Sequence, residues 1–179
     1  LPNMDNGLTE LKSLGYLNSQ SGVIGILDFG YDIYNFEPLE RKVQPGRYLV
    51  ETVSIYDRVA GIRIRFDEDK APTKWYAAKT HSGNGIYGAD AGNLTIFDVQ
   101  SLLGLSRIEK QKLVNKWTLS DCPELISMTG ECDCAITTSG FGDGSFPAFW
   151  GVSDDEVVSL YIDFMILVKE NDDGVRISI

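Results

Sequence analysis

Basic residues are missing from a long part of this sequence, because the segment from Trp117 to Val168 contains no lysine and no arginine. Residues 1–119 carry 14 acidic and 14 basic side chains, whereas residues 120–179 carry 12 acidic and 2 basic ones. The whole net charge of −10 therefore arises in the last third. A field of one sign attracts partners of the opposite sign, so we expect a basic protein partner. The same acidity argues against nucleic acid, whose phosphates are bound by Lys and Arg.

Long hydrophobic runs are also missing. The longest one, Val157 to Val168, is interrupted by Ser159 and Asp163. It falls short of the roughly 20 apolar residues that a membrane span needs, so we expect no membrane segment. A chain of 179 residues with 43% hydrophobic residues is nevertheless apolar enough to bury a core. We expect one domain over residues 1–179.

Cysteine and histidine are scarce. Three cysteines, Cys122, Cys132 and Cys134, are an odd number and lie close together, which favours reduced thiols and a cytoplasmic location. They lack the fourth ligand of a structural zinc site, so we predict no metal and no cofactor. His81 is the only histidine and lies in a loop-like Ser-Gly-Asn-Gly context, so a serine or cysteine nucleophile lacks its usual base.

Alternation of apolar and polar residues predicts strands through most of the chain. From Ile62 to Phe66 the apolar residues occupy one face and Arg63 and Arg65 the other. We expect Arg47–Tyr56 and Val59–Phe66 to form an antiparallel hairpin that reverses at Asp57-Arg58. Another short apolar run covers Val23–Phe29, and further strands are predicted at Lys74–Lys79, Gly85–Ala89, Leu94–Asp98, Cys134–Thr138, Phe146–Trp150, Val157–Val168 and Val175–Ile179.

Two segments have helical signals. The leucines from Leu8 to Leu17 recur every three residues, which predicts a short N-terminal helix that Gly15 helps to end. Ser106 and Glu109 form a capping-box pattern that predicts a helix over about residues 106–117. The fold class that follows is mainly β: an antiparallel β-sandwich-like domain with two peripheral helices.

Four carboxylates are candidates for catalysis: Asp90, Asp98, Asp143 and Asp163. Together with Asp28, they stand in apolar or glycine-rich surroundings. If they converge, they could bind a hard cation or supply the paired carboxylates of glycoside hydrolysis. In the structural alternative, Asp90 and Asp143 are turn acids bound to their own backbone, and Asp163 points to the solvated face of an edge strand.

The most distinctive string runs from Ser139 to Gly151. Its glycines suggest a phosphate loop, but no Lys-Ser or Lys-Thr follows and the local charge repels phosphate. Its aromatic residues could stack on a sugar or a base, or could form a buried sheet face. The candidate binding residues here are Gly142, Asp143, Gly144, Phe146 and Trp150, and the aromatic set also includes Phe141 and Phe149.

Several motifs follow one another along the chain: Pro45-Gly46-Arg47-Tyr48, the turn Tyr87-Gly88-Ala89-Asp90-Ala91-Gly92, the Gly142-Asp143-Gly144-x-aromatic element and Asp163-Phe164. Their order resembles the bacterial family catalogued as domain of unknown function 4241. The similar region covers residues 20–165. One departure is Phe146, where the family pattern has Tyr. The resemblance implies a domain and its boundaries, and it leaves function open.

Two functions from different classes remain. The first is a non-enzymatic binding or interaction module, immunity-like in covering the basic surface of a partner. It requires exposed acids in the last third of the chain, and the expected ones are Asp121, Glu124, Asp154, Asp155, Glu156, Asp172 and Asp173. The alternative is a hydrolase or cation-dependent enzyme, which requires the four candidate carboxylates to meet in a cleft.

Overall fold

Strands dominate the fold, as the sequence predicts. A computed structural model describes residues 9–30, 33–117, 122–166, 169–171 and 174–176. Within these ranges the helices are α1 (Val99–Leu103) and α2 (Arg107–Lys116). The strands are β1 (Thr9–Ser19), β2 (Ile24–Leu27), β3 (Gly46–Ile55), β4 (Arg58–Arg65), β5 (Lys74–Ala77), β6 (Ile86–Ala89), β7 (Asn93–Asp98), β8 (Glu124–Ser127), β9 (Cys132–Thr138), β10 (Gly144–Ser153), β11 (Glu156–Asp163), β12 (Lys169–Asn171) and β13 (Gly174–Arg176).

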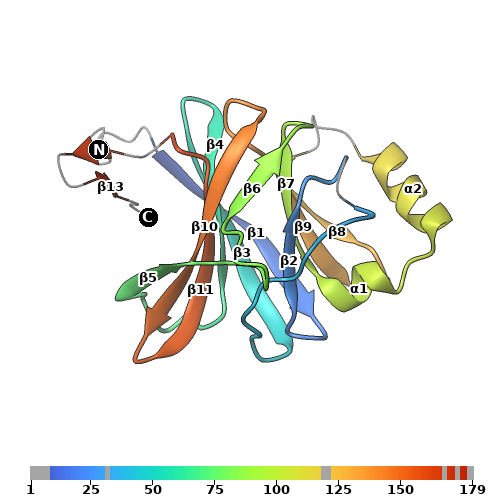
Figure 1. Cartoon of the computed structure of the whole chain (residues 1–179), viewed down its shortest axis with the longest axis horizontal. Helices are drawn as coiled ribbons and strands as arrows, with labels where there is room; N and C mark the ends of the chain where they lie inside the picture. The colour runs from blue at the N-terminus through green and yellow to red at the C-terminus, as the bar shows by residue number, and fades with distance from the viewer. Residues whose placement is uncertain (1–8, 31–32, 118–121, 167–168, 172–173, 177–179) are drawn as a thin grey trace.

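Two antiparallel sheets form the body of the protein (Figure 1). The larger sheet has seven strands in the order β1-β3-β4-β11-β10-β5, and β6 pairs with the first part of β10. The smaller sheet has four strands in the order β2-β7-β9-β8. A separate hairpin joins β12 to β13. This topology confirms the predicted antiparallel, mainly β class.

The hydrophobic core has two parts. Between the two sheets, Ile64 of β4 and Trp150 of β10 pack in the same cluster as Ile96 of β7. On the other face of the smaller sheet, Phe97 packs in a cluster with Leu102 of α1. Because neighbouring residues of a strand point to opposite faces, β7 serves both clusters. The helices lie beside the smaller sheet, away from the larger one (Figure 1). No helix in the described ranges is long and apolar enough to cross a membrane.

The predicted hairpin is confirmed as β3 and β4, which pair antiparallel, but it reverses at Tyr56-Asp57, one residue before the predicted Asp57-Arg58. Tyr56 and Asp57 have φ values of 52° and 60°, the pair of positive values that a tight two-residue hairpin turn requires. Ile62 and Ile64 are fully buried, and Phe66 is partly buried against the same core. The alternation in the sequence therefore correctly predicted which residues of this strand face the core.

The predicted helix near residues 106–117 is confirmed as α2. The backbone N–H of Glu109 donates to Ser106 Oγ at 3.3 Å, and the N–H of Ser106 donates to the Glu109 carboxylate at 2.8 Å. Both interactions of a capping box are thus present. The second helix, α1, follows β7 directly, and the sequence patterns did not predict it.

The predicted N-terminal helix is wrong, because Thr9–Ser19 is strand β1, paired with β3. A β-bulge shifts the register between Ser13 and Gly15, where Gly15 has a φ of +114°. The extra residue lets Leu14 and Leu17, three positions apart, both contact the core. The bulge therefore accounts for the spacing of Leu14 and Leu17, whereas Leu11 is 58% exposed and does not belong to the core.

The other predicted strands are present with shifted ends, as β2, β5, β6, β7, β9, β10, β11 and β13. The predicted strand Val157–Val168 ends early, because β11 stops at Asp163, and residues 167–168 lie outside the described ranges. Residues 177–179 of the last predicted strand also lie outside them. The pattern did not predict β1, β8 or β12.

Candidate functional site

Asp28 links the end of β2 to the turn that precedes β7. The buried carboxylate accepts hydrogen bonds from the backbone N–H groups of Asp90 and Ala91, both at 2.6 Å. It also accepts one from the Gly30 N–H at 2.9 Å and one from the Asn93 side-chain amide at 3.2 Å. Four donors leave this carboxylate little capacity for a ligand, and its role is to hold two turns together.

Asp98 lies at the N-terminus of α1 and is completely buried. One carboxylate oxygen accepts from the hydroxyls of Ser19 at 2.7 Å and Ser21 at 2.6 Å, and from the Ser21 N–H at 3.0 Å. The other accepts from the Ser101 N–H at 3.1 Å. Burial raises the pKa of Asp98, but the hydrogen bonds together lower the pKa by more than burial raises it. The pKa of Asp98 therefore lies below its ordinary value. Asp98 thereby connects β1 to α1.

Asp90 and Asp143 come together through strand register. Ala89 of β6 pairs with Gly144 of β10, so the two aspartates adjoin the same residue pair at one end of this ladder. Both are exposed. The structure thus brings together two of the four candidate carboxylates, on the surface.

Asp163 lies elsewhere, in an environment that the sequence did not predict. The expectation of a solvated edge strand is wrong, because β11 runs between β4 and β10 and Asp163 is only 2% exposed. Burial raises the pKa of its carboxyl group, and a hydrogen bond from the Met165 N–H at 2.8 Å offsets part of that effect.

No metal-binding group is evident in the described ranges: they contain no group of three His, Cys, Asp or Glu side chains placed to hold a metal ion. Cys132 is exposed, Cys122 is partly buried, and Cys134 is fully buried. Burial raises the pKa of the Cys134 thiol well above its ordinary value, which opposes thiolate formation.

The aromatic residues of the Ser139–Gly151 segment divide between core and surface. Phe146 and Trp150 lie in the core between the sheets, and Phe146 packs edge-to-face on Phe164 with the ring centroids 5.2 Å apart. The buried-face alternative therefore describes these two rings. Phe141 is 73% exposed, in the turn that also contains Gly142.

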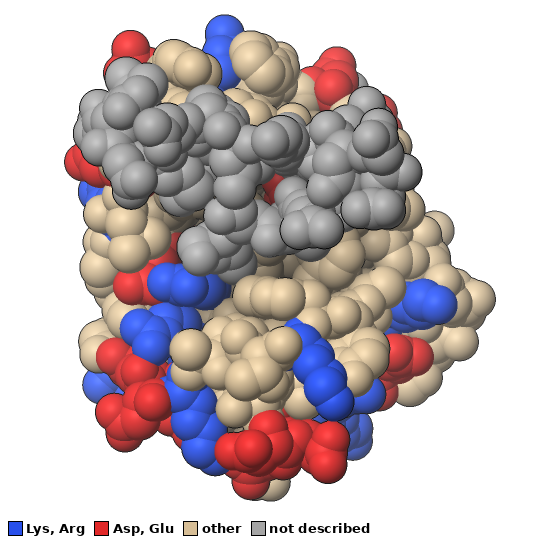
Figure 2. Space-filling model, turned by 90° about the vertical axis from the view of Figure 1, so that its left-hand side faces the viewer, with Lys and Arg blue, Asp and Glu red and all other residues tan. Residues whose placement is uncertain are grey.

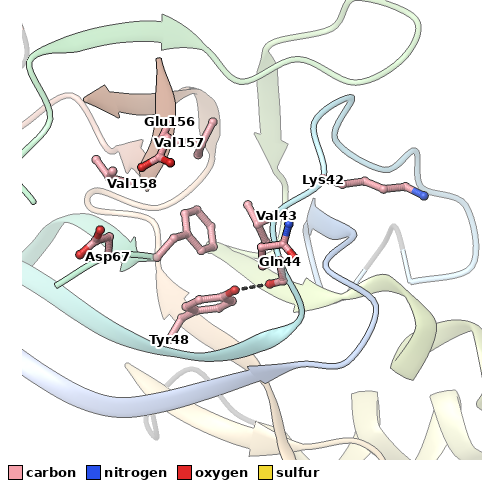
Figure 3. Close-up of a pocket in the computed structure, with 9 residues that line it drawn as sticks. Lys42, Val43, Gln44, Tyr48, Asp67, Glu156, Val157 and Val158 are labelled. Carbon is pink, nitrogen blue, oxygen red and sulfur yellow. Dashed lines mark hydrogen bonds between the residues drawn. The ribbon is translucent and has the colours of Figure 1, made fainter. Parts of the chain in front are cut away.

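A pocket of about 360 Å³ opens at one end of the sandwich (Figure 3). Its walls come from three separate segments: the loop before β3 together with the start of β3, the residues that follow β4, and the start of β11. Tyr48 and Phe66 pack edge-to-face in it, with ring centroids 4.9 Å apart. The lining residues are Lys42, Val43, Gln44, Tyr48, Phe66, Asp67, Glu156, Val157 and Val158.

The tyrosine in this pocket belongs to the Pro45-Gly46-Arg47-Tyr48 motif. Its hydroxyl donates to the backbone carbonyl of Gln44, as the dashed line in Figure 3 marks, and burial raises the pKa of Tyr48. The ring therefore stays neutral and fixed. Sequence reasoning missed this pocket, and the motif was the available signal for it.

Carboxylates border the pocket. Lys70 donates to Glu156 at 2.5 Å and lies 3.7 Å from Asp67. The hydrogen bond and charge of Glu156 raise the pKa of Lys70, with smaller contributions from Asp67 and Asp154. Lys42 also lines the pocket, but its ammonium group points away from the other labelled residues in Figure 3.

We define the acidic end of the molecule as the loop Asp67–Asp69 together with the turn Asp154–Glu156. Asp154, Asp155 and Glu156 are exposed, as predicted. Glu124 is only partly exposed, and the predicted Asp121, Asp172 and Asp173 lie outside the described residues. The β10–β11 turn lies at the lower edge of Figure 1, and in Figure 2 acidic side chains gather along the lower edge of the adjacent face.

The charge asymmetry of the sequence becomes partly mixed in space. Strand β11, from the acidic third, pairs with β4, which carries Arg63 and Arg65. Arg63 itself forms an ion pair with Glu51 at 2.6 Å. Figure 2 accordingly shows Lys and Arg among Asp and Glu on one face. On the described part of this face, the acidic residues are therefore mixed with basic ones.

A second pocket, of about 380 Å³, lies between the last turn of α2 and strand β8. Leu113, Trp117, Leu125 and Ile126 give it apolar walls, with Lys116 and Glu124 beside them. The indole N–H of Trp117 is buried and has no hydrogen-bond partner among the described residues. Residues 118–121, which follow Trp117 directly, lie outside the described ranges, and we assign this pocket no role.

Comparison with known proteins gives a family and nothing more specific. No curated protein and no solved structure matches the chain. One family model matches residues 17–162, which include the Tyr48 motif, the Asp90 turn and the Ser139–Gly151 segment. The chain therefore belongs to the family described as "Protein of unknown function (DUF4241)".

Proposed function

We infer that this protein is a non-enzymatic binding module whose acidic end recognises a basic segment of a protein partner. The observation that carries the proposal is the pocket with Tyr48 and Phe66 in its interior and with Asp67 and Glu156 at its border. Aromatic faces carry partial negative charge and attract Lys or Arg side chains, and nearby carboxylates add to this attraction. The volume of about 360 Å³ lies within the usual range of ligand pockets.

The exposed acids around the pocket supply the longer-range part of recognition. Glu68 and Asp69 are exposed beside Asp67, and the Asp154-Asp155 turn precedes Glu156. The electric field of these acids increases the association rate of a basic partner, and salt reduces this effect by screening the field. An immunity-like role, in which the protein covers the basic surface of a toxin, is the specific form of this proposal.

Lys70 competes with a partner's cation for the carboxylates at the pocket. Lys70 already pairs with Glu156 and Asp67. A cationic side chain of a partner must therefore share these carboxylates with Lys70 or displace Lys70 from them. Lys70 and both carboxylates are solvent-accessible, and ion pairs at the surface contribute little to stability because water and salt screen them. Exchange of Lys70 for a partner's cation therefore costs little, and removing Lys70 should strengthen the binding of basic peptides.

A peptide titration followed by NMR tests the proposal. The probes are two peptides of equal length, one with alternating Lys and Gly and one in which Gln replaces each Lys. We expect the Lys peptide to shift backbone resonances of Tyr48, Phe66, residues 67–70 and residues 154–158, and the Gln peptide to shift none of them. Phe66→Leu should weaken binding several-fold, because it removes the aromatic face and leaves the carboxylates in place.

The matched control is Lys70→Met, for which we expect tighter binding of the Lys peptide. Shifts spread evenly over all exposed acids, or equal shifts with the Gln peptide, would show that the pocket is not a recognition site. The proposal would then be wrong even if the protein bound cations weakly elsewhere.

A further inference from the structure

The turn between β9 and β10 presents an aromatic side chain to solvent. Phe141 is 73% exposed, although Phe146 in the same segment is buried. The turn is closed by a hydrogen bond from the Gly142 N–H to the Ser139 carbonyl at 3.1 Å and one from the Ser139 hydroxyl to the Gly142 carbonyl at 2.7 Å. Gly140 and Gly142 have φ values of 64° and 112°, which favour glycine. The backbone around this exposed ring is therefore well defined.

Arg58, from the neighbouring β3–β4 turn, holds the ring in place. Its guanidinium carbon lies 4.6 Å from the centroid of the Phe141 ring. One of its nitrogens also donates to the Gly140 carbonyl at 3.2 Å. The two turns lie side by side at the upper edge of Figure 1. A ring that is fixed before binding loses less side-chain entropy when a partner covers it.

Apart from its contact with Arg58, the exposed ring of Phe141 contributes little to the fold. A mostly exposed phenyl ring contributes little hydrophobic stabilisation, since that term scales with the apolar area removed from water. Tyr56, in the β3–β4 turn, is also 62% exposed. Aromatic residues and arginine are the side chains that most often dominate the binding energy of protein interfaces. The two turns present this combination together.

The charges around the ring indicate the kind of partner. Asp57 adjoins Arg58, Asp143 follows Phe141 by two residues, and Asp90 adjoins the Ala89–Gly144 pair. All three acids are exposed, and so is Arg58, whose guanidinium contacts the ring and a carbonyl, so three acidic side chains surround one basic one. The surroundings are thus acidic, which disfavours nucleic acid and favours a protein with Lys or Arg around an apolar recess.

We propose that Phe141, positioned by Arg58, is the anchor of a second protein-binding surface and inserts into an apolar pocket bordered by basic residues on a partner protein. This surface goes beyond the binding function proposed above. Arg58 begins β4 and Phe66 follows its end, so this surface and the pocket lie at opposite ends of one strand. The two can fail or succeed independently.

The test begins with site-specific photo-crosslinking in cells that naturally produce the protein. A benzophenone amino acid replaces Phe141 in one variant and Tyr76, an exposed tyrosine on β5, in the control. We expect a defined protein adduct from position 141 and none from position 76. The adduct partner is then purified, and its binding to the intact wild-type chain and to variants is measured by calorimetry.

Phe141→Ala should weaken this binding by about 30-fold or more, the effect expected of an interface hot spot. Arg58→Gln should weaken it less, and should increase fast backbone motion at Gly140 and Phe141 in ¹⁵N relaxation, which distinguishes positioning from direct contact. Thermal unfolding midpoints should stay close to wild type in both variants. The proposal is overturned by an adduct with nucleic acid, by an adduct with a second copy of this chain, by equal crosslinking at both positions, or by unchanged affinity of Phe141→Ala.

Discussion

At the scale of single residues, two buried aspartates, Asp98 and Asp163, have pKa values shifted in opposite directions. Asp98 and Asp163 are both buried, but Asp98 accepts hydrogen bonds from three serines, whereas the described contact of Asp163 is a single backbone donor. The pKa of Asp98 is accordingly lowered and that of Asp163 is raised. Neither difference is visible in the sequence, because Ser19 and Ser21 reach Asp98 from a distant strand.

Asp98→Asn should destabilise the protein by about 2–3 kcal/mol at pH 7. In asparagine a nitrogen replaces one carboxylate oxygen, and this nitrogen cannot accept the hydrogen bond from the Ser21 N–H. This donor therefore loses its partner. Because the folded pKa of Asp98 is lowered, its stabilisation is present above the ordinary value of 3.8 and is lost as the pH falls through the folded pKa. Urea unfolding of both proteins from pH 7 down to acid should show the difference shrinking. A constant difference would contradict this assignment.

Asp163→Asn should stabilise the protein at pH 7, on the order of 1 kcal/mol. Asparagine removes the cost of a buried charge and retains an oxygen for the Met165 N–H. A raised folded pKa favours the folded state below the ordinary value of 3.8, and this benefit is lost as the pH rises through the folded pKa. The gain of the variant should therefore be absent in acid and appear as the pH rises. Loss of stability at pH 7 would show that Asp163 has an ionic partner.

At the scale of elements, the sequence patterns predicted those elements that depend on neighbouring residues in the chain. The alternation of residues 62–66 identified the β3–β4 hairpin, and Ser106 with Glu109 identified the start of α2. Their determinants lie within a few residues of one another in the sequence. In β1 the bulge at Ser13–Gly15 places Leu14 and Leu17 on the same face, and the exposed Leu11 fits the helical spacing only by coincidence, so the same reasoning failed there.

Strand order is the part of the fold that the sequence could not supply. Asp163 was expected on an edge strand, but β11 is enclosed by β4 and β10, and that order depends on pairings between distant segments. The pocket has the same origin, because Tyr48, Phe66 and Glu156 belong to three separate parts of the chain. Candidate residues could be chosen by type, as for Asp90 and Asp143, but their grouping required the sheet register.

At the scale of the whole molecule, the charge distribution bears on the proposed binding function. Among the described residues, the acidic third of the sequence is interleaved with basic ones, because β11 pairs with β4, and Asp133 and Asp163 are buried. What remains exposed is concentrated in turns. In the proposed function, the electrostatic attraction of a partner comes from such local groups, and the Asp154-Asp155-Glu156 turn is one of them.

Neutralising this turn, with Asp154→Asn, Asp155→Asn and Glu156→Gln together, should leave the free energy of unfolding within about 0.5 kcal/mol of wild type, since exposed positions contribute little. Association with a basic partner should become slower, while the dissociation rate changes less, because rim charges act mainly on encounter. The difference should disappear near 1 M salt, where the screening length is about 3 Å.

Stopped-flow measurement at several salt concentrations checks this prediction, with Glu68→Gln as a single-charge control in the same region. Asn retains the tendency of Asp to adopt the positive φ values of 50° and 65° found at residues 154 and 155, so the turn itself should persist. A rate that is insensitive both to the triple substitution and to salt would mean that the acids of this turn do not steer a partner. Recognition would then have to rest on the aromatic pocket and on Phe141 alone.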